Sequence, residues 1–158
     1  MLFRSGNSYG AGGRVIAALG GGAVLRAGLG ARRLDPGAGG GTPSTPLTAE
    51  LGLGLRPGRY ASVGIAYSRR AFDETARLID SGYVLDGVDL SMDVSPTPSL
   101  SLSGGGGVTW LSDGNRRIGG VAAVLVSPTG GVQLGGFTRM MGYRFTPVPS
   151  HGYFAPDR

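Results

Sequence analysis

An all-β fold is what this sequence predicts, in the form of an antiparallel up-and-down meander of about eight strands. Its 158 residues include 32 glycines and 10 prolines, which disfavour long helices because glycine costs roughly 1 kcal/mol in a helix interior. Apolar and polar residues alternate with a period of two in several segments, as they do along strands with two different faces. The connections between these segments alternate between short and long, which is typical of successive hairpins.

The alternating segments occupy most of the first two thirds of the chain. In DGVDLSMDV, for example, apolar Val88 and Leu90 alternate with polar Asp89 and Ser91. Successive side chains of a strand point to opposite faces, so each such segment has one apolar face and one polar face. The expected strands are a weaker one at 14–20 and clear ones at 23–32, 47–55, 61–68, 86–94 and 100–110.

Two further strands are expected near the C-terminal end. The segment 117–127 is apolar on both faces. In the segment 131–145 the apolar residues change register, because Val132 and Leu134 are even-numbered whereas Phe137 is odd-numbered. A β-bulge at Gly135–Gly136 would place all of them on one face.

The lengths of the connections indicate how the strands are arranged. Short connections are expected near residue 21 and at 56–59, 95–98 and 127–131, and long ones at 34–46, 70–86, 111–117 and after 145. A meander with all short turns at one end and all long loops at the other is the layout of outer-membrane barrels. Several segments also approach ten residues, enough to cross a bilayer at about 45° tilt, whereas soluble strands average about five or six.

These features predict a transmembrane β-barrel or a fragment of one. In that fold the Leu and Val face meets lipid, and the polar face lines a lumen. The same two-faced strands would also suit a soluble secreted β-sandwich that binds ligands through its Gly- and Pro-rich loops, with the polar face in water. Both alternatives remain open from the sequence.

The composition excludes several kinds of site. The absence of cysteine excludes disulfides, thiolate nucleophiles and cysteine-based metal centres. All 15 basic residues are arginine, so neither a phosphate-binding GxxxxGK loop nor a catalytic lysine is present. The net charge of +5 would suit nucleic acid, acidic glycans or anionic lipid, and it selects none of them.

The charged residues on the polar faces are the candidate binding residues. In a barrel they would line the lumen, where opposed charges either pair with one another or contact a polar solute. The candidate lumen residues are Arg26, Arg32, Glu50, Asp89 and Asp93.

One loop motif resembles the start of a calcium-binding loop. Asp113, Gly114 and Asn115 have the right order, but Arg116 and Arg117 occupy positions where further oxygen ligands should follow. A turn flanked by solvated arginines is therefore favoured, and no metal site is expected.

Catalytic groups are equally scarce. His151 is the only histidine, and it has no cysteine to act with. Asp73 and Glu74 could act as a carboxylate pair, but they more simply begin a short helix that ends at Gly82. Since no nucleophile, base and orienting group come together, we expect a protein without enzymatic activity and without a cofactor.

Three loop motifs resemble those of bacterial outer-membrane barrels that follow tetratricopeptide repeats, such as the C-terminal barrel of the cellulose-export subunit. They are WLSDGNRR (110–117), FDETARLIDSG (72–82) and GYFAPDR (152–158), the last with Gly152, Tyr153, Phe154 and Pro156. The resemblance covers roughly residues 47–158. The chain departs from the family in lacking a preceding helical repeat and a final strand that ends in an aromatic residue.

This resemblance implies a function and a location. It implies a non-enzymatic conduit or anchor for surface-polysaccharide export in the outer membrane of a Gram-negative bacterium. The implied partners are outer-membrane lipid, the polysaccharide and the barrel-assembly machinery, and no nucleic acid is expected. Residues 1–158 would form a single β-barrel domain, as a fragment truncated at one or both ends.

Overall fold

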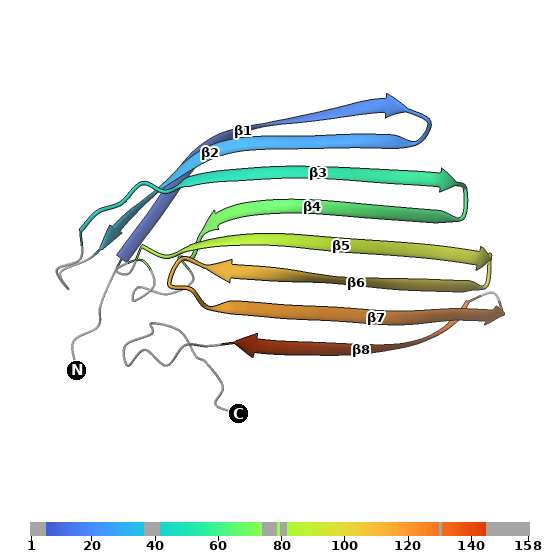
Figure 1. Cartoon of the computed structure of the whole chain (residues 1–158). Helices are drawn as coiled ribbons and strands as arrows, with labels where there is room; N and C mark the ends of the chain where they lie inside the picture. The colour runs from blue at the N-terminus through green and yellow to red at the C-terminus, as the bar shows by residue number, and fades with distance from the viewer. Residues whose placement is uncertain (1–5, 37–41, 74–78, 80–81, 130, 145–158) are drawn as a thin grey trace.

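The computed structural model describes residues 6–36, 42–73, 79, 82–129 and 131–144. In this part of the chain eight strands form one sheet in the order β1-β2-β3-β4-β5-β6-β7-β8, and every neighbouring pair is antiparallel (Figure 1). The described ranges contain no helix long and apolar enough to span a membrane. The strands are β1 (Gly6–Gly20), β2 (Ala23–Pro36), β3 (Leu47–Gly58), β4 (Ala61–Ala71), β5 (Val84–Thr97), β6 (Leu100–Leu111), β7 (Arg116–Thr129) and β8 (Val132–Arg144).

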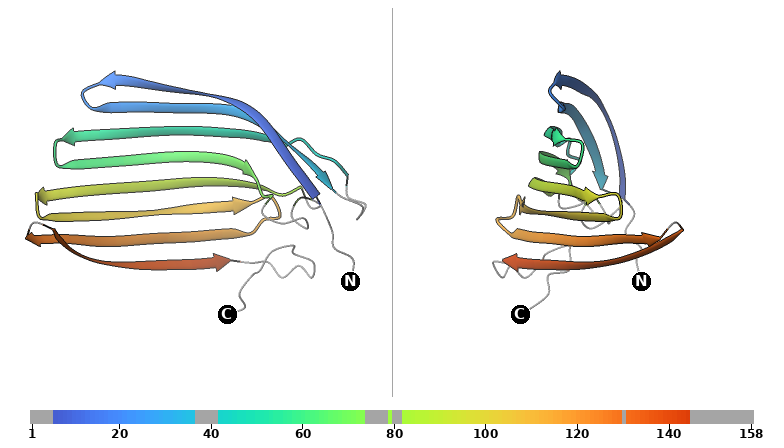
Figure 2. Two further views of the ribbon diagram at one scale, coloured as in Figure 1. Left: turned by 180° about the vertical axis from the view of Figure 1, so that it is seen from behind. Right: turned by 90° about the vertical axis from the view of Figure 1, so that its right-hand side faces the viewer.

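The predicted all-β antiparallel meander is therefore confirmed. The sheet is a single curved layer, and β1 and β2 bend over toward one side at the end of the long connections (Figure 2). It is not closed, because β1 pairs only with β2 and β8 only with β7 among the described residues. This architecture is consistent with a barrel or a fragment of one.

The strands are longer than the sequence patterns indicated. β1 begins at Gly6 rather than near residue 14, and β2 continues to Pro36. At the short turns the pairing continues past prolines that were expected to end it, because the register shifts between Leu55 and Gly58, between Val94 and Thr97, and between Val126 and Thr129. Each shift spans a proline, and a proline at an irregular pair forfeits no ladder hydrogen bond.

The bulge predicted at Gly135–Gly136 is wrong. β8 pairs without interruption with β7 through this region, with Gly135 opposite Leu125 and Phe137 opposite Ala123. No bulge is needed because β7 is itself apolar on both faces, so apolar residues of β8 have apolar neighbours on either side of the sheet. Phe137 consequently lies on the opposite face from Leu134.

The core is small and lies at the end with the long connections. Leu34, Ala71 and Ile79 form a buried cluster there, and Leu85 is also buried. The chain after β2 turns back beside that strand, since Leu34 and Ser44 exchange backbone hydrogen bonds of 2.8 and 3.1 Å. Most large apolar side chains of the strands lie outside this core.

Candidate functional site

One side of the sheet, here called the apolar face, carries a band of aliphatic side chains. Register pairs place Leu25, Leu53, Ile65 and Leu90 in one row across β2 to β5, and the row ends at Met140 of β8. Within this band the exposed fractions reach 76% for Leu29, 68% for Leu47 and 63% for Leu134. No described residue packs over the band, so it is a broad exposed apolar surface of the kind that soluble monomers rarely present.

The other side, here called the polar face, carries all of the candidate lumen residues. Arg26 and Asp89 occupy one row, linked through Gly52 and Ala66. The residues of the polar face also line the hollows of the sheet, which identifies this face as the concave one. The candidates that lie on it are Arg26, Arg32, Glu50, Asp89 and Asp93.

A glycine lets two of the polar-face charges meet across an intervening strand. Arg14 of β1 and Glu50 of β3 are both opposite Gly28 of β2, and the Arg14 Nη2 to Glu50 Oε2 distance is 2.6 Å. A Cβ at Gly28 would lie 3.6 Å from the Glu50 Cβ and 3.9 Å from the Arg14 Cβ, so a longer side chain there would occupy the path of the ion pair. Glu50 is thus one of the candidates that pairs structurally.

The acidic residues Asp89 and Asp93 line a second part of the polar face. They border a hollow of about 480 Å³ whose floor is the glycine-rich part of β6 and whose other side includes Arg117 and Arg139. The Asp89 carboxylate lies directly over Gly107, where a Cβ would collide with it. No ion pair among the described residues includes either aspartate, so negative and positive charges face each other across a strand without neutralising one another.

Sequence reasoning did not anticipate the role of Asp73. Its carboxylate forms an ion pair with Arg32 and accepts a 2.7 Å hydrogen bond from the Ser8 hydroxyl, and Arg32 Nη2 donates to that hydroxyl at 3.0 Å. Asp73 therefore links the segment after β4 to strands β1 and β2, at the end of the sheet that carries the long connections. Most of the helix expected from Asp73 to Gly82 falls on residues 74–78 and 80–81, which lie outside the described ranges. Ile79 is helical, and Gly82 has a φ of 62° and donates its N–H to the Ile79 carbonyl at 3.2 Å.

Replacing Asp73 with alanine is expected to lower the free energy of unfolding by about 1–2 kcal/mol. The substitution removes a charge-assisted hydrogen bond and leaves the partly exposed Arg32 without its counter-charge. The control is Asp35→Ala, which removes the ion pair between Arg33 and Asp35, two residues apart on β2, together with a hydrogen bond from Tyr9. Its loss should be smaller, because Asp35 and these partners are more exposed than Asp73 and Arg32. Urea unfolding followed by circular dichroism checks this, and equal losses in the two variants would contradict a bridging role for Asp73.

The polar face becomes apolar toward β8. Phe137 is 81% exposed there, and Val121, Leu125 and Met141 are exposed beside it. Tyr143 also lies on this face, because it is opposite Arg117. The odd-numbered apolar residues of β8 already indicated an apolar area on this face. The bulge expected from the sequence would have placed them on the other face instead.

The loop between β6 and β7 is a turn. Asn115 is 1% exposed, its backbone N–H donates to Asp113 Oδ1 at 3.0 Å, and its side-chain amide donates to Asp113 Oδ2 at 3.0 Å. Gly114 adopts a φ of 86°, which glycine tolerates without strain. Both carboxylate oxygens of Asp113 thus accept hydrogen bonds within the turn. Arg116 follows the turn at the start of β7 and lies on the apolar face.

The motif residues Gly152, Tyr153, Phe154 and Pro156 lie outside the described ranges. Within those ranges no group of three or more His, Cys, Asp or Glu side chains could hold a metal ion.

The fold defines the class of this protein as an antiparallel β-meander with one apolar and one polar, concave face. No family model, curated protein or solved structure matches the chain. The resemblance to polysaccharide-export barrels therefore depends on the loop motifs alone.

Proposed function

We propose that this chain forms the wall of an outer-membrane β-barrel that serves, without catalysis, as a conduit or anchor for the export of a surface polysaccharide. The observation that carries the proposal is the contrast between the two faces of a single-layer sheet. The apolar face suits lipid, and the concave polar face suits a hydrated lumen. The loop motifs supply the expectation that the solute is a polysaccharide.

Charge placement on the polar face supports the proposed role of the lumen. Asp89 and Asp93 stand on one side of the glycine floor of β6, and Arg117 and Arg139 on the other. Carboxylates accept hydrogen bonds from hydroxyl groups and guanidinium groups donate to them. Such a surface can exchange hydrogen bonds with a polyhydroxylated chain that slides along it.

The size of the barrel distinguishes a conduit from an anchor. Eight strands closing on themselves would enclose an interior filled by side chains, through which no polymer passes. Passage of a polysaccharide thus requires further strands, from the same protein or from another copy. With eight strands alone, the barrel acts as an anchor.

The proposal is tested by refolding the chain in the presence of phosphatidylcholine vesicles. We expect it to float with the vesicles in a density gradient and to resist extraction by alkaline carbonate. Recovery as a water-soluble monomer would favour the soluble β-sandwich instead.

Transport is tested on the vesicles that contain protein. Entry of a fluorescent neutral oligosaccharide is expected to be faster than into empty vesicles and to slow in Ser103→Trp, which fills the hollow on the polar face. Leu102→Trp, at the next position but on the apolar face, is the matched control and should leave entry unchanged. Floating protein without faster entry would support the anchor and reject the conduit.

A further inference from the structure

The apolar face ends in a row of charged and aromatic side chains on the side of the long connections. Register pairs place Arg69 opposite Asp86, Asp86 opposite Trp110, Trp110 opposite Arg116 and Arg116 opposite Arg144. The next row toward the short turns is apolar or small. That row contains Tyr67, Val88, Val108, Ile118 and Gly142. The charged row therefore borders the band directly.

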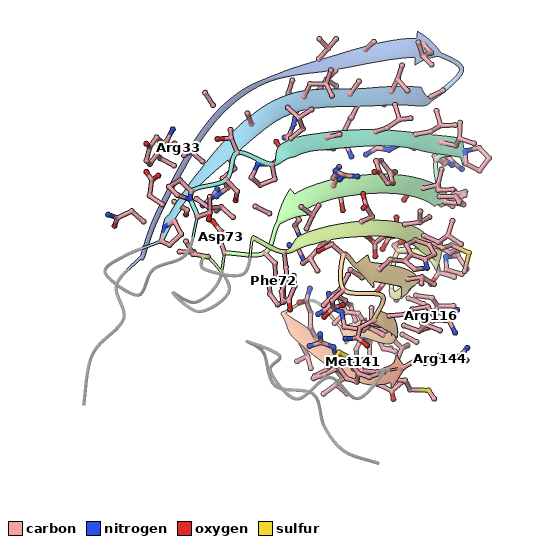
Figure 3. All side chains as sticks on the ribbon, turned by 60° about the vertical axis from the view of Figure 1, so that its left-hand side comes forward. Arg33, Phe72, Asp73, Arg116, Met141 and Arg144 are labelled. Carbon is pink, nitrogen blue, oxygen red and sulfur yellow. The ribbon has the colours of Figure 1, made fainter. Side chains whose placement is uncertain are left out.

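Two of these arginines stand together without a counter-charge. Arg69 is within 3.3 Å of Asp86, but no ion pair among the described residues includes Arg116 or Arg144. These two are direct cross-strand partners, with neighbouring side chains at the edge of the sheet (Figure 3). Like charges directly opposite each other destabilise a strand pair. An anion bound between them would remove that cost.

We propose that Arg116, Arg144 and Trp110 form a binding site for the phosphate group of a membrane lipid. Two guanidinium groups present parallel N–H donors that match phosphate oxygens. The indole of Trp110, 44% exposed, has the amphipathic character that favours the level of lipid headgroups. Acyl chains attached to the phosphate would then lie along the adjoining apolar band. The inference depends on the proposed membrane location of the apolar face.

The apolar band distinguishes a lipid phosphate from free phosphate. A free phosphate ion would contact only the two arginine side chains. These are solvent-accessible, so they bind an anion only weakly in water. A lipid gains in addition the burial of its chains against residues such as Ile118, which is 47% exposed. The site is expected to select lipids by the charge of their headgroup.

The single tryptophan of the sequence reports on this site directly. The chain is refolded into phosphatidylcholine vesicles that contain a minor share of phosphatidylglycerol, with bromine on the acyl chains of one lipid or the other. We expect brominated phosphatidylglycerol to quench Trp110 fluorescence well beyond its share of the lipid. The enrichment should be roughly fivefold for each arginine at low salt, and should fall in Arg116→Gln/Arg144→Gln to the level of a random mixture.

The matched control is Arg117→Gln/Arg139→Gln, which removes the same charge from the same two strands on the polar face. It should keep the enrichment. Equal enrichment in both double variants would overturn the site, and so would quenching in the unaltered protein that merely follows lipid composition. Abolition of the enrichment by sodium phosphate, but not by sodium chloride of equal ionic strength, would show a site for free phosphate instead. Absence of quenching by either brominated lipid would reject the membrane location, and with it the proposed function.

Discussion

Replacing Leu90 with arginine is expected to destabilise the assembled protein by about 2–4 kcal/mol, because the charge would enter the middle of the apolar band that we propose faces lipid. Leu90 is 56% exposed and lies in the row that Leu53 shares, so Leu53→Arg should have a similar effect. The measurement is the fraction of protein folded in vesicles at increasing urea concentration. The size of the effect follows from the cost of a guanidinium group near the bilayer midplane, and it would be small on a surface exposed to water.

The matched control for this prediction is Ser91→Arg. Ser91 follows Leu90 directly but lies on the polar face, where it borders the hollow lined by Asp89 and Asp93. An arginine there should be tolerated. If Leu90→Arg and Ser91→Arg unfold at the same urea concentration, the apolar face does not meet lipid and the membrane proposal is wrong.

Replacing Gly30 with valine is the second substitution for which we expect a large effect. A Cβ at this position would lie 2.7 Å from the carbonyl oxygen of Ala11, 2.9 Å from the Thr48 hydroxyl and 3.1 Å from the Gly12 Cα. Gly30 and Gly12 are direct partners on the concave face of the sheet. We expect a loss of about 1–3 kcal/mol or more, because backbone must move to admit the side chain.

The position next to Gly12 provides the control for this prediction. Gly13 lies on the apolar face, and a Cβ there would meet nothing within 4 Å. Gly13→Val should therefore leave the urea midpoint unchanged or raise it slightly, since valine also favours strands. Loss of the same size in Gly13→Val and Gly30→Val would mean that glycine is required for its backbone freedom rather than for the close approach of β1 and β2.

The fold was predictable because alternation with a period of two is a local signal. Val88, Leu90 and Met92 share a face in any strand, whatever lies beside them, so the two faces of each strand followed from short segments. The order of the strands was indicated by the alternation of short and long connections. The continuation of β3 past Pro57 was not predictable in this way, because it depends on an irregular pair with β4 in which the missing N–H is not needed.

The candidate site was predictable in part for the same reason. Alternation put Glu50 and Asp89 on the polar face, but it could not tell which would find a partner. Glu50 pairs with Arg14 only because β2 has a glycine between them, and Asp73 meets Arg32 only because the segment after β4 returns toward β1. Both contacts depend on which strands become neighbours. The composition of a single strand does not contain that information.

The two unpaired edges of the sheet have a consequence for assembly. Among the described residues, β1 and β8 each present a row of backbone N–H and C=O groups without a partner strand. Every such group left unsatisfied in hydrocarbon costs several kcal/mol, so neither edge can enter the bilayer alone. For a sheet embedded as we propose, insertion and edge pairing must then occur together. A hairpin inserted with an open edge would leave its backbone groups unsatisfied in hydrocarbon, so partly inserted states of the sheet would be unfavourable.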